Sequence, residues 1–166
     1  MPQGGERVMK ENDFIVSKTD LKGKITYCNE IFMEMAAMSE AELLGKPHSI
    51  VRHPDMPKAV FKLLWDRIQN GEEIFAYVKN RSKDGKFYWV YANVTPSYDK
   101  SGNIIGYYSV RRKPNPKALE TIIPVYAQMR SLERGGGMEA SMSYLNDLLD
   151  KKGVSYDELV SALQKG

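Results

Sequence analysis

Residues 45–58 read GKPHSIVRHPDMPK. This stretch predicts the end of one helix, a loop, and the start of the next helix in the first half of the chain. Gly45 ends the helical pattern before it, and Pro47 prevents that helix from continuing. Asp55 has the side chain of a helix N-cap, and Pro57 is tolerated in the first turn of the helix predicted next. The polar residues just before Pro57 therefore stand where a loop turns into a helix.

Upstream of this stretch, the pattern predicts two strands and two short helices. Residues 13–19 and 25–29 are rich in β-branched and aromatic residues and are separated by turn residues, which predicts a β-hairpin. Residues 30–37 have helical spacing. Ser39 and Glu42 form a capping box, which predicts a second short helix.

Downstream, one amphipathic helix and three strands are predicted. The helix has apolar residues at helical spacing on one face: Val60, Phe61, Leu64, Trp65 and Ile68. The strands cover residues 73–81, 87–97 and 104–112, and glycine-containing turns separate them. This order predicts an α+β fold, in which a five-stranded antiparallel sheet carries short helices on one face.

The C-terminal third is predicted to be helical. Residues 118–132 form a helical candidate that we expect to break or kink at Pro124, and the glycines at 135–137 predict a flexible joint before two further short helices. The second of these helices is predicted to begin at a capping box formed by Ser155 and Glu158. The apolar positions of these last helices suit packing on the chain's own core, dimerisation or partner binding. The expected division is a flexible segment over 1–12, a domain over 13–113, a linker helix over 114–134, and a hinge with two helices over 135–166.

Composition narrows the class of protein. A chain of 166 residues fits one domain with an appendage. The 24 Lys and Arg against 21 Asp and Glu are scattered along the sequence, so we expect no nucleic-acid partner. Cys28 is the single cysteine, which excludes an internal disulfide and fits the cytoplasm. No apolar run approaches the ~20 residues of a membrane span, and the N-terminus does not resemble a secretory signal, so we expect a soluble protein.

No pattern of catalytic or metal chemistry is present. His48 and His53, the two histidines, are five positions apart, which suits metal ligands on one helix face poorly. Nucleophile and phosphate-binding motifs such as GxSxG and GxGxxG are missing. The sequence therefore predicts a binding domain rather than an enzyme. From the local pattern alone, a helix-capping role for Asp55 is at least as well supported as ligand contact. In the same way, Arg52 could pair with a surface carboxylate instead of a ligand.

Beyond these patterns, the chain resembles a known family. The order of elements, with Asn29 closing the second strand, resembles PAS sensor domains, and residues 45–58 resemble the aerotaxis-receptor branch of bacterial PAS domains. Further blocks carry the same resemblance: Phe61 with Trp65, VKNR at 78–81, KDG at 83–85, YWV at 88–90, ANVTP at 92–96 and GYYSVR at 106–111. Together they cover about residues 13–130.

The resemblance implies an FAD-binding redox or energy sensor, with the flavin held between the sheet and the short helices. It also implies signalling by contact with a membrane-bound methyl-accepting transducer, from a stand-alone cytoplasmic protein that could form a homodimer. The cofactor-binding residues that it implies are Asn29, Arg52, His53, Asp55, Phe61, Trp65, Asn80 and Asn93.

These residue types suit a flavin. The arginine fork of Arg52 can bind a pyrophosphate or a ring carbonyl, and His53 can stack or hydrogen-bond beside the ring. An amide such as Asn29 or Asn80 both donates and accepts, as the N3–H and carbonyl edge of an isoalloxazine requires.

Two alternatives use the same fold. A haem-based gas sensor would need His48 or His53 as its axial ligand. A ligand-free PAS interaction module would have its pocket closed by side chains. The related domains carry a tryptophan where this chain has Ile74, and strand alternation predicts that the neighbouring Phe75 points to the opposite face.

Overall fold

The structure is a computed structural model that describes residues 5–166. Its elements follow in the order β1 (Ile15–Thr19), β2 (Ile25–Cys28), α1 (Glu30–Ala36), α2 (Glu40–Leu43), the 3-10 helix η1 (His48–Val51), α3 (Lys58–Gln69), β3 (Ile74–Arg81), β4 (Phe87–Tyr98), β5 (Ile104–Arg112), α4 (Pro116–Lys152) and α5 (Tyr156–Lys165). Both capping boxes expected from the sequence are present, at Ser39 with Glu42 and at Ser155 with Glu158.

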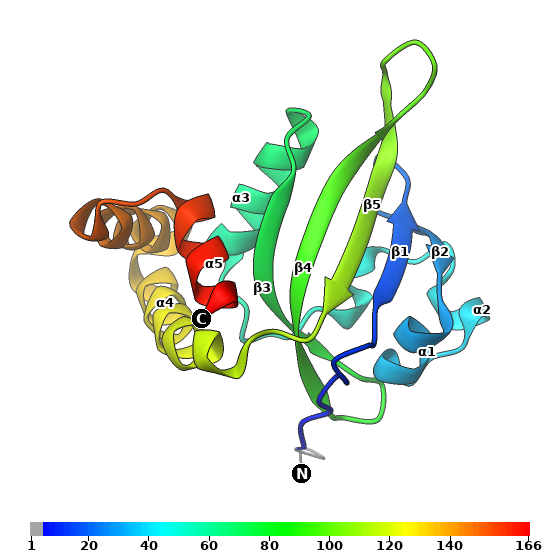
Figure 1. Cartoon of the computed structure of the whole chain (residues 1–166), viewed down its shortest axis with the longest axis horizontal. Helices are drawn as coiled ribbons and strands as arrows, with labels where there is room; N and C mark the ends of the chain where they lie inside the picture. The colour runs from blue at the N-terminus through cyan, green and yellow to red at the C-terminus, as the bar shows by residue number, and fades with distance from the viewer. Residues whose placement is uncertain (1–4) are drawn as a thin grey trace.

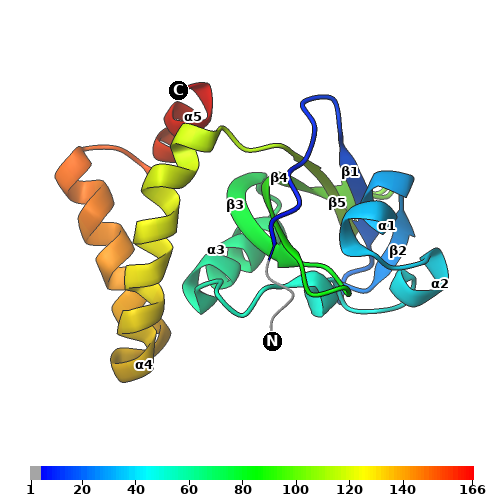
Figure 2. The same ribbon diagram turned by 90° about the horizontal axis from the view of Figure 1, so that it is seen from below.

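The five strands form one antiparallel sheet in the order β2-β1-β5-β4-β3. The short helices α1 and α2 and the longer α3 lie on one side of it, while α4 and α5 stand beside edge strand β3 (Figures 1 and 2). The α+β architecture predicted from the sequence is therefore confirmed. The face of the sheet toward α1 and α3 is called the inner face below, and the opposite face the outer face.

The segment before β1 was expected to be flexible. Residues 1–4 lie outside the described residues, whereas the backbone N–H of Arg7 donates to the carbonyl of Phe87 at 2.7 Å. Met9 is buried in the main hydrophobic cluster, with 2% of its surface exposed. Residues 5–12 are thus packed along the start of β4.

The long helix α4 doubles back on itself, so that its two halves lie side by side (Figure 2). The break in helical geometry falls at Gly137, whose φ of 68° and ψ of −167° suit only glycine. The expected break at Pro124 is wrong, because the helix continues through that residue. The joint expected at 135–137 is the tight turn of this helical hairpin.

Helix α3 has its N-terminus capped from outside its own segment. Its N-cap is Pro57, which has no side-chain acceptor, so the sequence interpretation of Asp55 as the cap is wrong. The carboxylate of Glu133, in α4, instead accepts the backbone N–H of Lys58 at 2.9 Å and that of Ala59 at 3.1 Å. Ser141, on the second half of the hairpin, donates to the same carboxylate at 2.6 Å.

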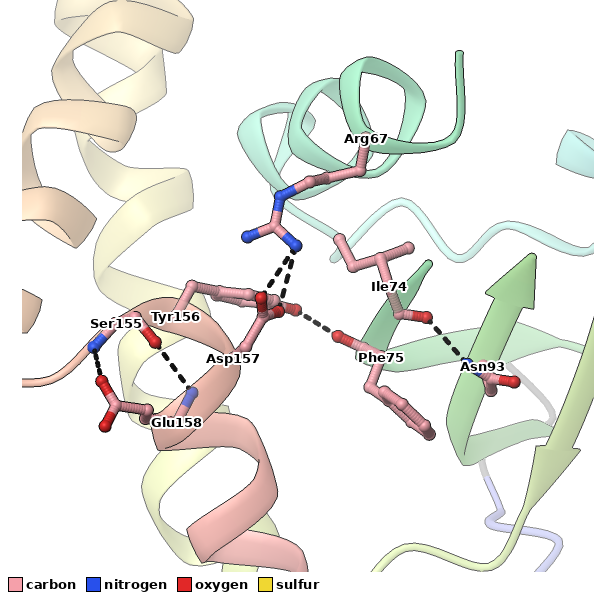
Figure 3. Close-up of polar contacts among 8 residues, drawn as sticks. All are labelled: Arg67, Ile74, Phe75, Asn93, Ser155, Tyr156, Asp157 and Glu158. Atoms are coloured by element: carbon pink, nitrogen blue, oxygen red, sulfur yellow. Dashed lines mark hydrogen bonds and ion pairs between the residues drawn. The ribbon is translucent and has the colours of Figure 1, made fainter. Parts of the chain in front are cut away.

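The C-terminal helices also satisfy the free edge of β3. The Tyr126 hydroxyl donates to the Tyr77 carbonyl at 2.6 Å, and the Tyr156 hydroxyl donates to the Phe75 carbonyl at 2.8 Å. Figure 3 shows the second of these contacts beside the ion pair between Arg67 of α3 and Asp157 of α5. Unpaired carbonyls on an edge strand invite pairing with another chain, and these tyrosines occupy them.

Candidate functional site

A cavity of about 260 Å³ lies between α3, the η1 segment and the inner face of the sheet. One wall carries Arg52, Phe61 and Trp65, and the sheet contributes Asn80 and Ala92 among others. This volume is close to the lower end of the range for small-molecule sites. The cavity is therefore the candidate ligand site of the domain.

Four of the residues implied by the resemblance meet in this cavity. The Arg52 guanidinium stacks on the Phe61 ring, with its carbon 3.6 Å from the ring centre. Arg52 also forms an isolated backbone bridge with Asn80, which brings the loop before α3 against β3. Trp65 lies edge-to-face against Tyr107, with the ring centres 5.5 Å apart. Arginine, amide and aromatic groups thus converge on one space.

Asn29 and Asn93 lie outside the cavity lining. The Asn29 side chain caps α1 by accepting the Phe32 N–H at 3.1 Å, and it also accepts from the backbone of β1. Asn93 donates to Glu73 at 2.7 Å and to the Ile74 carbonyl (Figure 3). Because alternate residues of a strand face opposite sides, Asn93 points to the outer face when Ala92 points into the cavity.

His53 and Asp55 also lie outside the cavity lining, where they order the loop before α3. His53 Nδ1 accepts the Asp55 N–H at 3.0 Å, and its ring meets the edge of Phe87. The Asp55 carboxylate pairs with Lys79 of β3 at 2.9 Å. The hydrogen bond from Lys79 lowers the pKa of Asp55. The described contacts of both side chains thus hold the loop in place.

The sequence interpretation missed the most buried charged group of the cavity, Arg111 of β5. Its side chain is 2% exposed and lies over the Phe32 ring at 4.6 Å. One terminal nitrogen donates to Ser17 Oγ at 2.6 Å, while Nε and Nη1 have no partner among the described residues. The alternation of β5 could have shown that Arg111 faces inward, but only once the register of that strand is known.

Two polar groups near Arg111, His48 in the cavity lining and Tyr88 outside it, are electrically neutral. His48 Nε2 lies 3.3 Å from Ser17 Oγ, and burial together with the charge of Arg111 lowers the pKa of His48 to about 3. Burial raises the pKa of the Tyr88 phenol to about 12. Asn80 lies close enough to the Tyr88 hydroxyl to oppose this rise, but within the described part of the chain neither that hydroxyl nor the Asn80 amide nitrogen makes a full hydrogen bond. The cavity therefore offers buried donors without acceptors.

Ile74, the position where the resemblance led us to expect tryptophan, is packed tightly. Ile74 is 1% exposed and joins a small cluster with Ile68 and Tyr107 beside the cavity. Phe75 stacks on Tyr91 of the outer face, with the ring centres 5.4 Å apart, which confirms the orientation expected from strand alternation. The indole that lines the cavity is instead that of Trp65.

Within residues 5–166, no cluster of three or more histidine, cysteine or acidic side chains could hold a metal ion. None of the described helices combines the length and the apolar character needed to cross a bilayer.

The fold and this cavity define the class. The family model described as the PAS fold matches residues 25–111, more than half of the chain, and the chain therefore belongs to the PAS-fold family. Within that family, it is 37% identical over 123 residues to the aerotaxis receptor of Escherichia coli (strain K12), a match that covers 74% of this chain and 24% of the receptor. The predicted resemblance is confirmed at this level.

Other relatives extend the comparison. The chain is 28% identical over 87 residues to the biofilm dispersion protein BdlA of Pseudomonas aeruginosa, which covers 52% of this chain and 21% of that protein. The chain thus spans about a quarter or less of these two relatives.

Solved structures show the same fold. The light-state LOV domain of the photoreceptor Aureochrome1 superposes with a TM-score of 0.59 at 20% identity, over 69% of this chain and 90% of the other. A light-oxygen-voltage domain studied with a flavin analogue superposes with a TM-score of 0.57 at 23% identity, over 67% of this chain and 83% of the other.

Proposed function

We propose that this chain is an FAD-binding redox or energy sensor that signals by protein contact and is not itself an enzyme. The observation that carries the proposal is the set of unpartnered buried donors, from Asn80 and Arg111, in a cavity walled by Phe61 and Trp65. An isoalloxazine offers two ring carbonyls, an acceptor-rich edge and an aromatic face, and these match that set. The aerotaxis receptor and the LOV domain studied with a flavin analogue support the same ligand class.

The residues divide into two proposed roles. Asn80 is placed to donate to a ring carbonyl, Trp65 and Phe61 to pack against the ring, and Arg52 to bind a carbonyl or the pyrophosphate. The other four expected residues, which are Asn29, His53, Asp55 and Asn93, act by positioning the loop and strands around the cavity. When bound, the flavin supplies a reversible reduction. The residues of the chain hold it and exclude water from it.

Substituting Asn80 tests this assignment. Asn80→Leu removes the unpartnered cavity donor, and we expect FAD affinity to fall about tenfold, the usual range for one lost hydrogen bond. Asn93→Leu is the matched control, since the Asn93 amide faces away from the cavity, and its affinity should be unchanged. Apoprotein titrated with FAD and with FMN, followed by flavin fluorescence, measures both variants. Equal affinities for the two variants would contradict the assignment.

The output is proposed to pass through the loop before α3 to the C-terminal helices. Arg52 lines the cavity at one end of this loop, while Arg130 of α4 donates to the Asp55 carbonyl at 2.7 Å. A shift of Arg52 on ligand reduction would therefore reach α4 through few contacts. We propose that α4 and α5 then present a changed surface to a membrane-bound methyl-accepting transducer, from the cytoplasm and as a homodimer.

Hydrogen exchange tests this output directly. Amides of the loop before α3 and of the Glu133–Ser141 region should exchange at different rates in the oxidised and the reduced protein. Helix α2, which does not line the cavity and lies far from α4, is the internal control (Figure 1). Identical exchange of the loop and of α4 in both states would overturn transmission by this route.

A further inference from the structure

The inner end of the cavity carries a positive charge for which the cavity provides no counterion. Arg111 is protonated at neutral pH, since burial lowers its pKa only to about 10. The residues that line the cavity include Lys22, Arg52 and Arg111 but no aspartate or glutamate. The neighbouring His48 and Tyr88 are both neutral at that pH. Arg111 therefore meets dipoles and an aromatic face, but no negative charge.

Such an arrangement destabilises the ligand-free protein. Removing a cation from water is costly even after the protein relaxes around it, and a counterion normally offsets that cost. The hydrogen bond to Ser17 and the contact with the Phe32 ring offset part of it, while Nε and Nη1 stay unpartnered among the described residues. A ligand that brings negative charge to these two nitrogens would remove the remaining penalty.

We propose that Arg111 makes this cavity bind the negatively charged form of its ring ligand in preference to the neutral form. The inference rests on the proposed function and adds to it the charge state that the site favours. For a flavin, two electrons and one proton from a reductant produce that form: the proton goes to N5, and N1 keeps the negative charge, shared with the adjacent carbonyl. Arg111 then sets the reduction potential, because it stabilises the reduced ring more than the oxidised one.

A reductive titration tests the inference. Flavin-loaded protein is reduced with dithionite, which is oxidised to sulfite, in the presence of a reference dye. In Arg111→Met, we expect the ratio of the affinities for the reduced and the oxidised ring to fall at least tenfold. For a two-electron couple, a tenfold fall lowers the reduction potential by about 30 mV. Arg111→Lys keeps the charge and should stay within about threefold of wild type.

Arg112 provides the matched control on the same strand. Its guanidinium lies over Tyr91 on the outer face, so Arg112→Met should leave the potential unchanged. An Arg111→Met potential equal to that of wild type would overturn the inference. So would a change of the same size in Arg112→Met, because the effect would then be one of net charge alone.

Two readouts on ligand-free protein separate this inference from the proposed function. Arg111→Met should unfold at the same or a higher urea concentration than wild type, because it removes a buried unpaired cation; a clear loss of stability would assign Arg111 a structural role and overturn the inference. If wild type takes up no FAD, the proposed function fails. Anilinonaphthalene sulfonate, an anionic aromatic probe, should then still bind wild type about tenfold more tightly than Arg111→Met, and equal binding would end the inference as well.

Discussion

Replacing Ala92 with phenylalanine is expected to abolish flavin uptake, with affinity at least ~100-fold lower, while the domain stays folded. Ala92 is 3% exposed and sits in the middle of β4, paired with Ala76 on one side and Arg111 on the other. Its side chain points into the cavity, so a benzyl group would occupy the space assigned to the ring. Large residues in a filled core usually cost ~1–3 kcal/mol, and here open volume reduces that cost.

The control for this substitution is Ala92→Ser, which changes polarity with little change in volume and should retain most of the affinity. Urea unfolding of all three proteins shows whether the fold is kept. An Ala92→Phe protein that is folded and binds FAD as tightly as wild type would mean that the ligand does not occupy this cavity.

The second large effect is expected at Glu133, which lies outside the cavity lining. Glu133→Ala removes the acceptor for two N–H groups at the start of α3, and we expect the free energy of unfolding to fall by about 2 kcal/mol. The N–H of Ala59 is the more costly loss, since Ala59 is fully buried. The amides of Lys58 and Ala59 should exchange with solvent faster, because the first turn of α3 loses its cap.

Two variants isolate the capping role. Glu133→Gln keeps an acceptor oxygen and should recover about half of the loss, while Glu139→Ala, at an exposed position of the same hairpin, should stay within about 0.5 kcal/mol of wild type. A Glu133→Ala protein as stable as Glu139→Ala would show that the contact between α4 and α3 contributes little.

The sequence predicted what depends on local patterns. Strand alternation, glycine turns and the two capping boxes each involve residues close together in the chain, and the structure confirms them. The cap of α3 could not be predicted in this way, because Glu133 lies 75 positions from Lys58. The glycine joint at 135–137 was predicted from local composition, and the chain does turn at Gly137, whereas the proline penalty wrongly favoured a further break at Pro124.

The candidate site was predictable in part, because some of its residues belong to short local motifs. Arg52, Phe61, Trp65 and Asn80 belong to blocks that carry the family resemblance, and they meet in the cavity. A motif does not say which way a side chain points, so it did not separate these residues from those that order a loop or cap a helix, such as His53 and Asn29. Arg111 was missed because an arginine near the end of a strand is usually exposed; only the pairing with β1 and β4 shows that it faces inward.

The absorbance spectrum of the purified protein, with identification of the chromophore released on heating, shows whether the chain holds a flavin. We expect flavin bands that bleach on reduction by dithionite, and about one FAD released per chain. A Soret band would indicate the haem-binding alternative, with His48 as the axial ligand available in the cavity. A colourless protein that also takes up no added FAD would contradict the account.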